Sequence, residues 1–288
     1  MDQVTSAIDL VSLDLKPRFT RILETCVPFV ITYPANHGAL DLAPFGISVA
    51  PRHRFTATRL DSRDAVDGLH HLDALTFGDQ DMLMPRWVLF DCGEFPGLVF
   101  GFGRQARDLP DYVRQAYRVE DRDDAFVPLS MWVAIRNAED RAWFGHNLSS
   151  ANILLREADA LPGLALLTKV LGVKATRCAK QYGATQWASA SIGLHLQLGD
   201  MALLSAYTPA HTHPETLAYR IDVEDERLVA GLTRAGAPAS PPATRVIDGT
   251  DGDAIRALHA ELEAGARWTM VAAERRGAAH HRLHLRSG

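Results

Sequence analysis

A glycine at the start of a long apolar segment is the first feature of this sequence that could do chemistry. Residues 163–174 are predicted to form a helix because Leu164, Leu167, Val170 and Leu171 recur at helical spacing. The first N–H groups of a helix have no partner within it, and small residues let an anion approach them. The backbone of Leu161, Gly163, Leu164 and Ala165 is therefore a candidate binding site for a diphosphate.

Two histidines are candidate acid–base groups because an imidazole exchanges protons near neutral pH. His195 lies in residues 188–198, where alternating apolar residues favour a strand while the flanking residues permit a short helix. His146 precedes Asn147 at the end of a predicted strand and is a candidate base. The alternative for both is a structural role, with His195 facing solvent from a strand and His146 satisfied by hydrogen bonds within the protein.

Lys169 is a candidate nucleophile because it lies on the predicted apolar helix. An amine that is desolvated there could form a Schiff base with a carbonyl compound. In the alternative, the methylene stem packs on apolar surface while the amine reaches water. The sequence leaves both readings of Lys169 open.

Other catalytic and metal-binding motifs are missing from the sequence. His211 and His213 would point to opposite sides of a strand, unless the neighbouring prolines make a turn there, and three further histidines lie near the C-terminus, His280, His281 and His284. No HExxH spacing is present, and no metal is predicted. The chain also lacks a GxSxG elbow, a phosphate loop and a GxGxxG fingerprint.

Composition excludes several classes of protein. The chain has 288 residues, of which 47% are hydrophobic and 23% charged, and a net charge of −5. These values are typical of globular proteins, and the mildly acidic balance disfavours nucleic acid as a partner. No apolar stretch is long enough to span a bilayer, and the first residues do not resemble a signal peptide, so we expect a cytoplasmic protein that binds no membrane.

The elements that must position these residues follow from periodicity. Helices are predicted over residues 17–29, 61–77, 109–117, 163–174, 226–232 and 253–263. Strands are predicted over residues 54–60, 127–135, 142–148, 179–187, 203–208, 216–223, 268–273 and 281–285, together with a hairpin made by residues 86–92 and 98–102.

This order of elements predicts an α+β fold with a mixed, largely antiparallel central sheet flanked by helices and a small C-terminal extension. We expect an N-terminal helical extension over residues 1–50, a core domain over 51–223, and a C-terminal extension over 224–288. The extension begins after a change in composition and includes a connector rich in proline and alanine at residues 235–243.

Two stretches within residues 54–223 resemble the GNAT-type N-acyltransferase superfamily. Residues 160–167 are similar to its acyl-CoA loop, with Gly163 and Ala165 at the matching small-residue positions and Ala160 where Arg or Gln is expected. Residues 188–199 are similar to its late helix, with Ala188 in place of an Asn and His195 in place of a Tyr. The resemblance implies that acetyl-CoA or another acyl-CoA binds at residues 161–165, and that His195 protonates the departing thiolate during acyl transfer to a small amine.

A second resemblance uses the same residues differently. Residues 192–198 and 201–207 could instead form a hairpin about Gly199-Asp200. In that case Lys169 looks like the Schiff-base amine of an acetoacetate decarboxylase-like lyase. That family has two adjacent lysines, whereas Lys169 lies between Thr168 and Val170. A third reading is a non-catalytic protein that binds a small molecule in a closed cavity lined by Trp132, Trp143 and Trp187. A small-molecule partner is expected in each case, and the chain could form a homodimer by exchanging its C-terminal residues.

Overall fold

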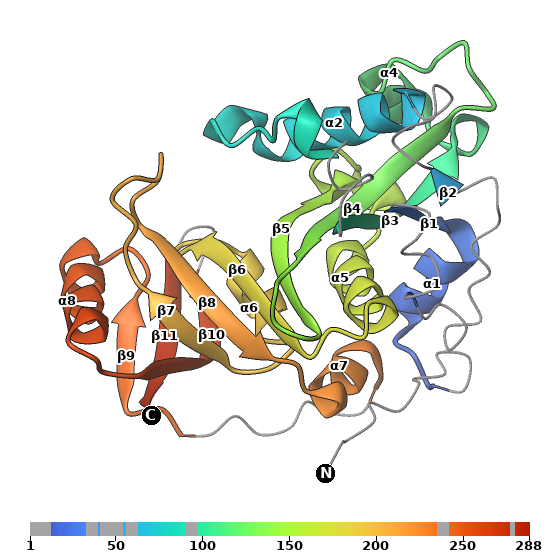
Figure 1. Ribbon diagram of the computed structural model, residues 1–288. Coiled ribbons are helices and arrows are strands. Elements are labelled where there is room, and N and C mark those ends of the chain that lie inside the picture. The colour runs from blue at the N-terminus through green and yellow to red at the C-terminus, as the bar shows by residue number, and fades with distance from the viewer. Residues whose placement is uncertain are drawn as a thin grey trace. The chain divides into compact units, whose positions relative to one another are not determined.

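The computed structural model describes residues 13–32, 40, 54–55, 63–89, 97–234, 242–276 and 280–288 (Figure 1). They belong to two compact units, which are taken in turn. The first comprises Met1–Asn137 with Gly145–Arg177, and the second comprises Ala138–Phe144 with Cys178–Gly288.

The first unit is built on a twisted sheet with helices packed against it. Its strands are β1 (Val27–Thr32), β2 (Arg54–Phe55), β3 (Gly97–Gln105), β4 (Phe126–Arg136) and the later part of β5 (Ala142–Ser150), in the order β2-β1-β3-β4-β5. β1 is parallel to β2 and antiparallel to β3, and β3 is antiparallel to β4. Its helices are α1 (Pro17–Thr25), α2 (Arg63–Phe77), α4 (Asp111–Ala116) and α5 (Leu164–Ala175), with 3-10 turns η6 (Gly78–Gln80), η7 (Ala106–Asp108), η8 (Ala151–Ile153) and η9 (Glu157–Asp159).

Helix α5 is the most buried helix of this unit. It packs on β3 and β4, where Thr168 hydrogen-bonds to Ser130 at 2.7 Å between hydroxyl oxygens. Gly172 lies so close to the ring of Trp132 that a Cβ there would be 2.3 Å from Cε3. Close packing on the sheet therefore fixes the direction of α5 and the position of its first turn.

In the second unit every described strand pair is antiparallel. Its strands are β6 (Lys180–Gln186), β7 (Met201–Ser205), β8 (Thr216–Asp222), β9 (Arg245–Asp248), β10 (Trp268–Arg276) and β11 (His280–Ser287), in the order β6-β8-β7-β10-β11-β9. Strands from the predicted C-terminal extension thus continue this sheet through β7.

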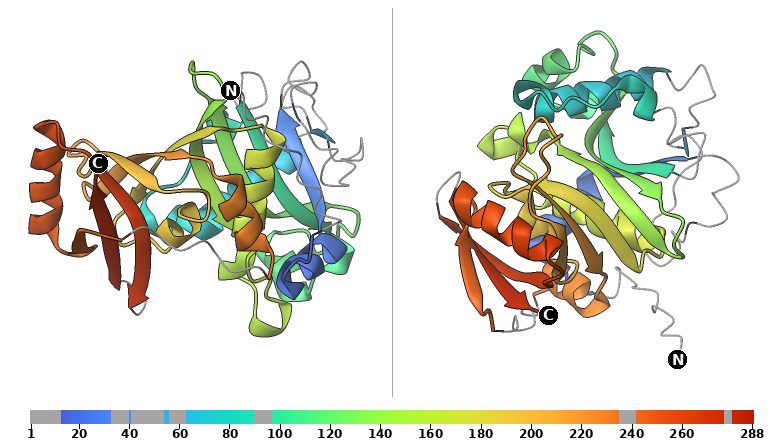
Figure 2. Two further views of the ribbon diagram at one scale, coloured as in Figure 1. Left: turned by 90° about the horizontal axis from the view of Figure 1, so that it is seen from below. Right: turned by 60° about the vertical axis from the view of Figure 1, so that its left-hand side comes forward.

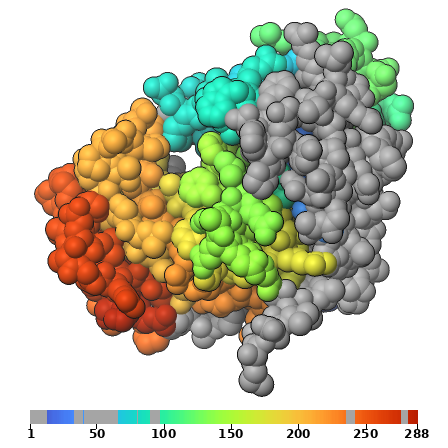
Figure 3. All heavy atoms as spheres, viewed as in Figure 1, coloured from blue at the N-terminus to red at the C-terminus, as the bar shows by residue number. Residues whose placement is uncertain are grey.

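Three helices accompany the strands of the second unit, α6 (Ser191–His195), α7 (Asp225–Leu232) and α8 (Gly252–Glu263). Helix α8 begins after Asp251, whose carboxylate accepts hydrogen bonds from the N–H groups of Asp253 and Ala254. It packs on β7 and β9 through Ile255 and Leu258 (Figure 2). Its opposite side faces solvent and appears as orange-red spheres in Figure 3.

The predicted α+β class and the largely antiparallel sheet are confirmed. The helices expected at 61–77, 109–117, 163–174, 226–232 and 253–263 are all present within a few residues in the described part of the chain. Most of the predicted strands are present too, and β9 was not predicted.

Two predicted elements are wrong. The helix expected over residues 17–29 ends at Thr25, because Val27, Val30 and Ile31 are β-branched and enter β1 instead. Residues 86–89 are helical and form no hairpin with β3, which pairs with β1 and β4. Residues 56–62, 90–96 and 235–241, on which parts of the predicted first strand, the hairpin and the connector fall, lie outside the described residues.

Residues 188–198, which the sequence left open between strand and helix, contain the short helix α6. A hairpin made by residues 192–198 and 201–207 is therefore wrong. Among the described residues, no helix has both the length and the apolar character needed to cross a membrane.

Candidate functional site

A tight turn sets the start of α5. Leu161, Pro162, Gly163 and Leu164 form a β-turn closed by a 3.0 Å bond from the Leu164 N–H to the Leu161 carbonyl. Gly163 has φ 89° and ψ 2°, the values of the third residue of a type II turn, where glycine is favoured and proline often precedes it. The Pro-Gly pair therefore dictates this turn and the entry of the chain into α5.

Asn152, from η8, holds this turn on the other side. Its Oδ1 accepts the Leu161 N–H at 2.9 Å, and its Nδ2 donates to the Leu161 carbonyl at 2.6 Å. The backbone of Leu161 is thus fully used by the protein itself, and Leu161 is buried. Of the four residues predicted to bind a diphosphate, Leu161 and Leu164 have N–H groups that are already occupied.

Three N–H groups of the first turn are not used in this way. Within the described residues, those of Gly163, Ala165 and Leu166 donate to no acceptor, and no side chain caps the helix. All three residues are half-buried and Pro162 beside them is exposed. The start of α5 is therefore neither capped by described protein atoms nor sealed beneath them, and its positive dipole end can attract an anion.

Helix α1 lies next to α5 (Figure 1) and brings one cationic side chain to the same turn and a second to the segment before it. A Cβ at position 163 would be 3.3 Å from Nε of Arg18 and 2.6 Å from Cε1 of Phe19. Arg21 Nη2 reaches the Ala158 carbonyl at 3.4 Å. Both arginines are exposed. Lys16, at the start of α1, has its pKa lowered by burial and by the nearby charge of Arg18.

One carboxylate in the segment before the turn is hydrogen-bonded within the protein. Asp159 accepts a 2.7 Å hydrogen bond from the Tyr112 hydroxyl, which itself accepts the Arg156 N–H at 3.1 Å. The guanidinium of Arg156 also lies over the Tyr112 ring, 4.2 Å from its centroid. Tyr112 therefore fastens η9, and with it the segment leading to the Leu161–Leu164 turn.

His195 lies at the end of α6 in the second unit and is 7% exposed. Its ring lies against that of Tyr219, with centroids 5.2 Å apart and planes inclined by 35°. Tyr219 in turn extends over Gly183, where a Cβ would be 2.5 Å from the phenol oxygen. The imidazole of His195 thus packs against the ring of Tyr219, which fits only because residue 183 is a glycine. Burial raises the pKa of Tyr219, so its hydroxyl stays protonated at neutral pH.

His146 lies on β5 in the first unit and is exposed. The surrounding protein still removes enough water to lower the pKa of its imidazole. The neutral form therefore dominates at neutral pH, as a proton acceptor requires.

Lys169 lies on α5 and is 1% exposed. It belongs to the largest fully buried side chains of the chain, and its amine does not reach bulk water. The snorkelling arrangement considered from the sequence is therefore wrong. Two of the tryptophans expected to line a closed cavity belong to different units. Trp132 packs on Gly172 in the first unit, and Trp187 donates a hydrogen bond to the Ala206 carbonyl in the second.

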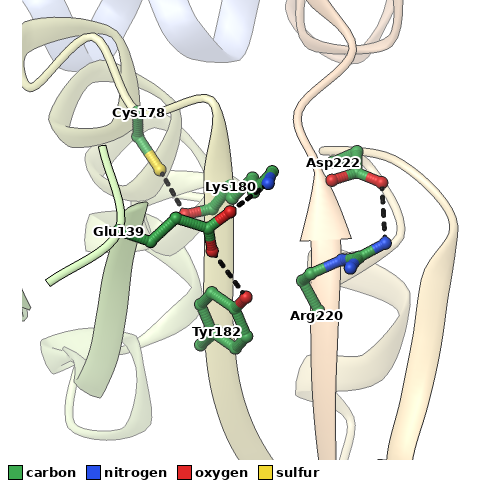
Figure 4. A network of polar contacts seen from close by, with 6 residues as sticks. All are labelled: Glu139, Cys178, Lys180, Tyr182, Arg220 and Asp222. Atoms are coloured by element: carbon green, nitrogen blue, oxygen red, sulfur yellow. Dashed lines mark hydrogen bonds and ion pairs between the residues drawn. The ribbon is translucent and has the colours of Figure 1, made fainter. Parts of the chain in front are cut away.

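A polar network in the second unit fastens the turn before β5 to β6 (Figure 4). Glu139 accepts hydrogen bonds from Lys180 and, at 2.8 Å, from the Tyr182 hydroxyl, while Cys178 Sγ donates to the Lys180 carbonyl at 3.2 Å. Hydrogen bonding to Glu139 raises the pKa of Lys180. A lysine kept protonated in this way is a poor nucleophile, so the network is structural.

The histidines considered as metal ligands do not gather. Among the described residues, no group of three or more His, Cys, Asp or Glu side chains is arranged to hold a metal ion. His211 and His213 lie in the loop before β8, where the His213 N–H donates to Nδ1 of His211. His281 is buried in β11, and His284 pairs with Glu274 at 3.1 Å.

Comparisons with known proteins return distant structural similarity. No model of a known protein family matches the chain. A comparison of the chain with curated proteins also finds no match.

Three solved structures illustrate the similarity. The ribosomal-protein-S18-alanine N-acetyltransferase of Escherichia coli is 9% identical, with 56% of this chain and 90% of that one covered and a TM-score of 0.38. The NatC complex bound to Gag peptide and CoA is 12% identical, with 58% and 95% covered and a TM-score of 0.36. A putative N-acetyltransferase of Lactobacillus plantarum is 9% identical, with 69% and 99% covered and a TM-score of 0.36. N-acetyltransferases are the class named by the sequence resemblance, but similarities this distant transfer no ligand or residue role.

Sequence reasoning missed several residues around the candidate site. Arg18 and Arg21 lie more than 130 positions before the turn they approach, and nothing local to α1 indicates that contact. Asn152 is a polar residue in an irregular segment, where its side chain carries no periodic signal. The glycine with proline before it, by contrast, was a usable turn signal.

Proposed function

We propose that this chain is an N-acyltransferase that takes an acyl group from an acyl-CoA, most simply acetyl-CoA, and passes it to a small amine. The observation that carries the proposal is that, within the described residues, the N–H groups of Gly163, Ala165 and Leu166 donate to no acceptor, while Arg18 lies beside Gly163 and Arg21 reaches Ala158 in the segment before the turn. A diphosphate needs several converging donors and a positive field, and the start of a long helix offers both.

The residues fit such a ligand by charge and by shape. Phe19 and Arg18 occupy the space that a side chain at position 163 would fill, and the type II turn presents the first N–H groups of α5 with no side-chain cap among the described residues. Ala160 occupies the position where the resembled family has Arg or Gln, and Arg18 from α1 supplies a guanidinium close to the same turn. We assign Gly163, Ala165 and Leu166 as backbone donors and Arg18 and Arg21 as cationic partners.

A base from the first unit is proposed for the chemistry. The acyl-CoA supplies an activated carbonyl, to which the amine nitrogen bonds while the carbon–sulfur bond breaks. His146, neutral because its pKa is lowered, accepts the proton released by the amine. The sulfur leaves as a thiolate, which takes a proton from solvent. The sequence resemblance implies a proton-donor role for His195, but His195 belongs to the second unit and is given no step at this turn.

A specific observation also favours a second candidate, a lyase that uses Lys169. The amine is desolvated, as Schiff-base chemistry requires, since its side chain is 1% exposed. The same burial leaves a carbonyl substrate little access to Nζ. We therefore place this candidate second.

Isothermal titration with acetyl-CoA and with CoA tests the proposal. Exposed arginines bind phosphate with modest energy, so we expect the variant Arg18→Gln/Arg21→Gln to bind about tenfold more weakly, a loss of about 1.4 kcal/mol. Arg107→Gln, which neutralises an exposed arginine in η7, should bind like the wild type. Binding should also weaken as salt rises.

Two results would remove the proposal. One is the absence of heat and of thermal stabilisation with millimolar acetyl-CoA, which would favour a protein that binds another small molecule. The other is a covalent adduct on Lys169 after borohydride treatment with a keto acid, found by mass spectrometry, which would favour the lyase.

A further inference from the structure

A buried carboxylate joins three segments of the first unit. Asp73, in α2, is 0% exposed. Its Oδ2 accepts the N–H of Met84 at 2.6 Å, and its Oδ1 accepts a hydrogen bond from Nδ2 of Asn147 on β5. One side chain therefore connects α2, the segment that follows η6, and the strand that carries His146.

The surroundings of Asp73 make these bonds hard to replace. Its two hydrogen-bond donors are neutral groups, and an ionised carboxylate out of water depends on such donors. Burial raises the pKa of Asp73, while the Met84 N–H, the Asn147 amide, the charge of His70 and the hydroxyl of Ser149 act in the opposite direction. Loss of one donor would leave a buried acceptor unpaired, so the groups are held together.

The bond to Asn147 has a consequence for its neighbour. Successive side chains on a strand point to opposite faces, so Asn147 directed at α2 turns His146 to the other face of β5. One peptide unit separates the two residues. Fixing the Asn147 side chain therefore fixes the backbone from which the imidazole of His146 projects.

We infer that Asp73 is a positioning residue, whose buried carboxylate holds Asn147 and thereby sets the place of His146 on β5. The inference rests on the proposed function for its catalytic meaning, because His146 is the base of that reaction. It assigns Asp73 no contact with substrate. Its effect on His146 is a property of the free protein and can be measured without any activity.

The test is the pKa of His146 in the unliganded full chain, measured by NMR of labelled histidine in the wild type, Asp73→Asn and Asn147→Ala. The His146→Gln variant identifies the resonance. The protein around the exposed His146 still lowers the pKa of its imidazole, and loosening β5 should weaken this effect, so we expect the pKa of His146 to rise toward its ordinary value in both variants. Asp79→Asn, an exposed acid in η6, serves as the control and should leave it unchanged.

Each other outcome overturns the inference. Loss of the Asp73 charge acting through space would lower the pKa of His146 in Asp73→Asn and leave Asn147→Ala unchanged. An unchanged pKa in both variants would mean that the bond only stabilises the unit. Asn147→Ala keeps the Met84 bond and the charge of Asp73, so it decides the question if Asp73→Asn does not fold.

Kinetics add a second, independent reading. We expect kcat for acyl transfer to fall about tenfold in Asp73→Asn with little change in KM, because a displaced base slows proton transfer more than binding. In a His146→Gln background the same change should have almost no further effect on kcat, and additive losses would contradict the inference. Absence of acyl transfer in the wild type would refute the proposed function alone, since the NMR result stands without it.

Discussion

Replacing Gly172 by alanine should destabilise the first unit, although the same change usually stabilises a helix. Gly172 lies within α5, where alanine gains about 1 kcal/mol over glycine. Its Cβ would be 2.3 Å from Cε3 and 2.7 Å from Cζ3 of Trp132, far inside the 3.5–4.0 Å or so at which carbon atoms pack well. Trp132 is 1% exposed and cannot turn away freely.

The sign of the effect follows from comparing the two terms. Overpacking of a dense core costs about 1–3 kcal/mol, and so short a contact belongs at the upper end of that range. Subtracting the gain in helix propensity leaves a loss of about 2 kcal/mol in the free energy of unfolding. For a unit of this size the melting temperature should fall by roughly 4–8 °C.

Gly193 provides the matched control for this experiment. It also lies in a helix, α6, but nothing is within 4 Å of the Cβ that alanine would add. Gly193→Ala should therefore leave stability unchanged or raise it by up to about 1 kcal/mol. Both variants would be compared by calorimetry and by circular dichroism.

A second mutation tests the cause. If the ring of Trp132 is the obstacle, the double variant Gly172→Ala/Trp132→Phe should be less destabilised than the sum of the single variants. A Gly172→Ala protein that melts at or above the wild-type temperature would refute the packing of α5 on β4 described above.

Three shorter predictions concern other buried groups. Asn152→Ala should lower the free energy of unfolding by about 1–3 kcal/mol in urea titrations, because the Leu161 N–H and carbonyl both lose their partner. The pKa of Asp73 is higher in the folded protein than in the unfolded chain. The contribution of Asp73 to stability is therefore complete at a pH below the unfolded pKa and is lost as the pH rises through the folded pKa. Between these two pKa values the free energy of unfolding of the wild type, relative to that of Asp73→Asn, should fall as the pH rises. Borohydride with a keto acid should leave Lys169 without a mass adduct, because the side chain is 1% exposed.

The elements best predicted from the sequence are those whose periodicity and burial agree. Helix α5 has apolar residues on nearly all sides, and the structure buries most of them against β3 and β4. Helix α8 has an N-capping aspartate followed by two core residues at helical spacing. In both cases a local signal and the tertiary packing require the same conformation.

Prediction from the sequence failed where the apolar residues of a helix are followed directly by those of a strand. Residues 17–31 contain a helical stripe that includes Phe19 and Ile22, followed without a gap by the apolar run of β1. Nothing in the spacing marks the change at Cys26, whose extended backbone ends the helix. Only pairing of β1 with β3, some 70 residues later, decides between the two.

At the candidate site, too, residues next to each other in sequence predict the local structure, while contacts from distant residues could not be predicted. The sequence predicts a helix that starts at Gly163, and the structure places Gly163 in a turn just before α5, with the φ that glycine permits. Whether its amides are open depends on Asn152 and on helix α1, whose approach cannot be inferred from residues near the turn. The sequence could therefore indicate where an anion would bind, but not which amides remain for it.

Gly163 illustrates why a glycine in a motif is weak evidence when considered alone. Three separate demands fall on this residue, namely the positive φ of the turn, the close approach of Phe19 from α1, and room for a ligand at the N–H groups. The first two are met by the protein itself and would retain glycine here even if nothing bound. The charge of Arg18 is also used within the protein, because its guanidinium lies over the ring of Phe19, 4.7 Å from the centroid. Neither Gly163 nor Arg18 alone therefore distinguishes an anion-binding turn from a structural one, and the titration of the arginine variants with acetyl-CoA decides between them.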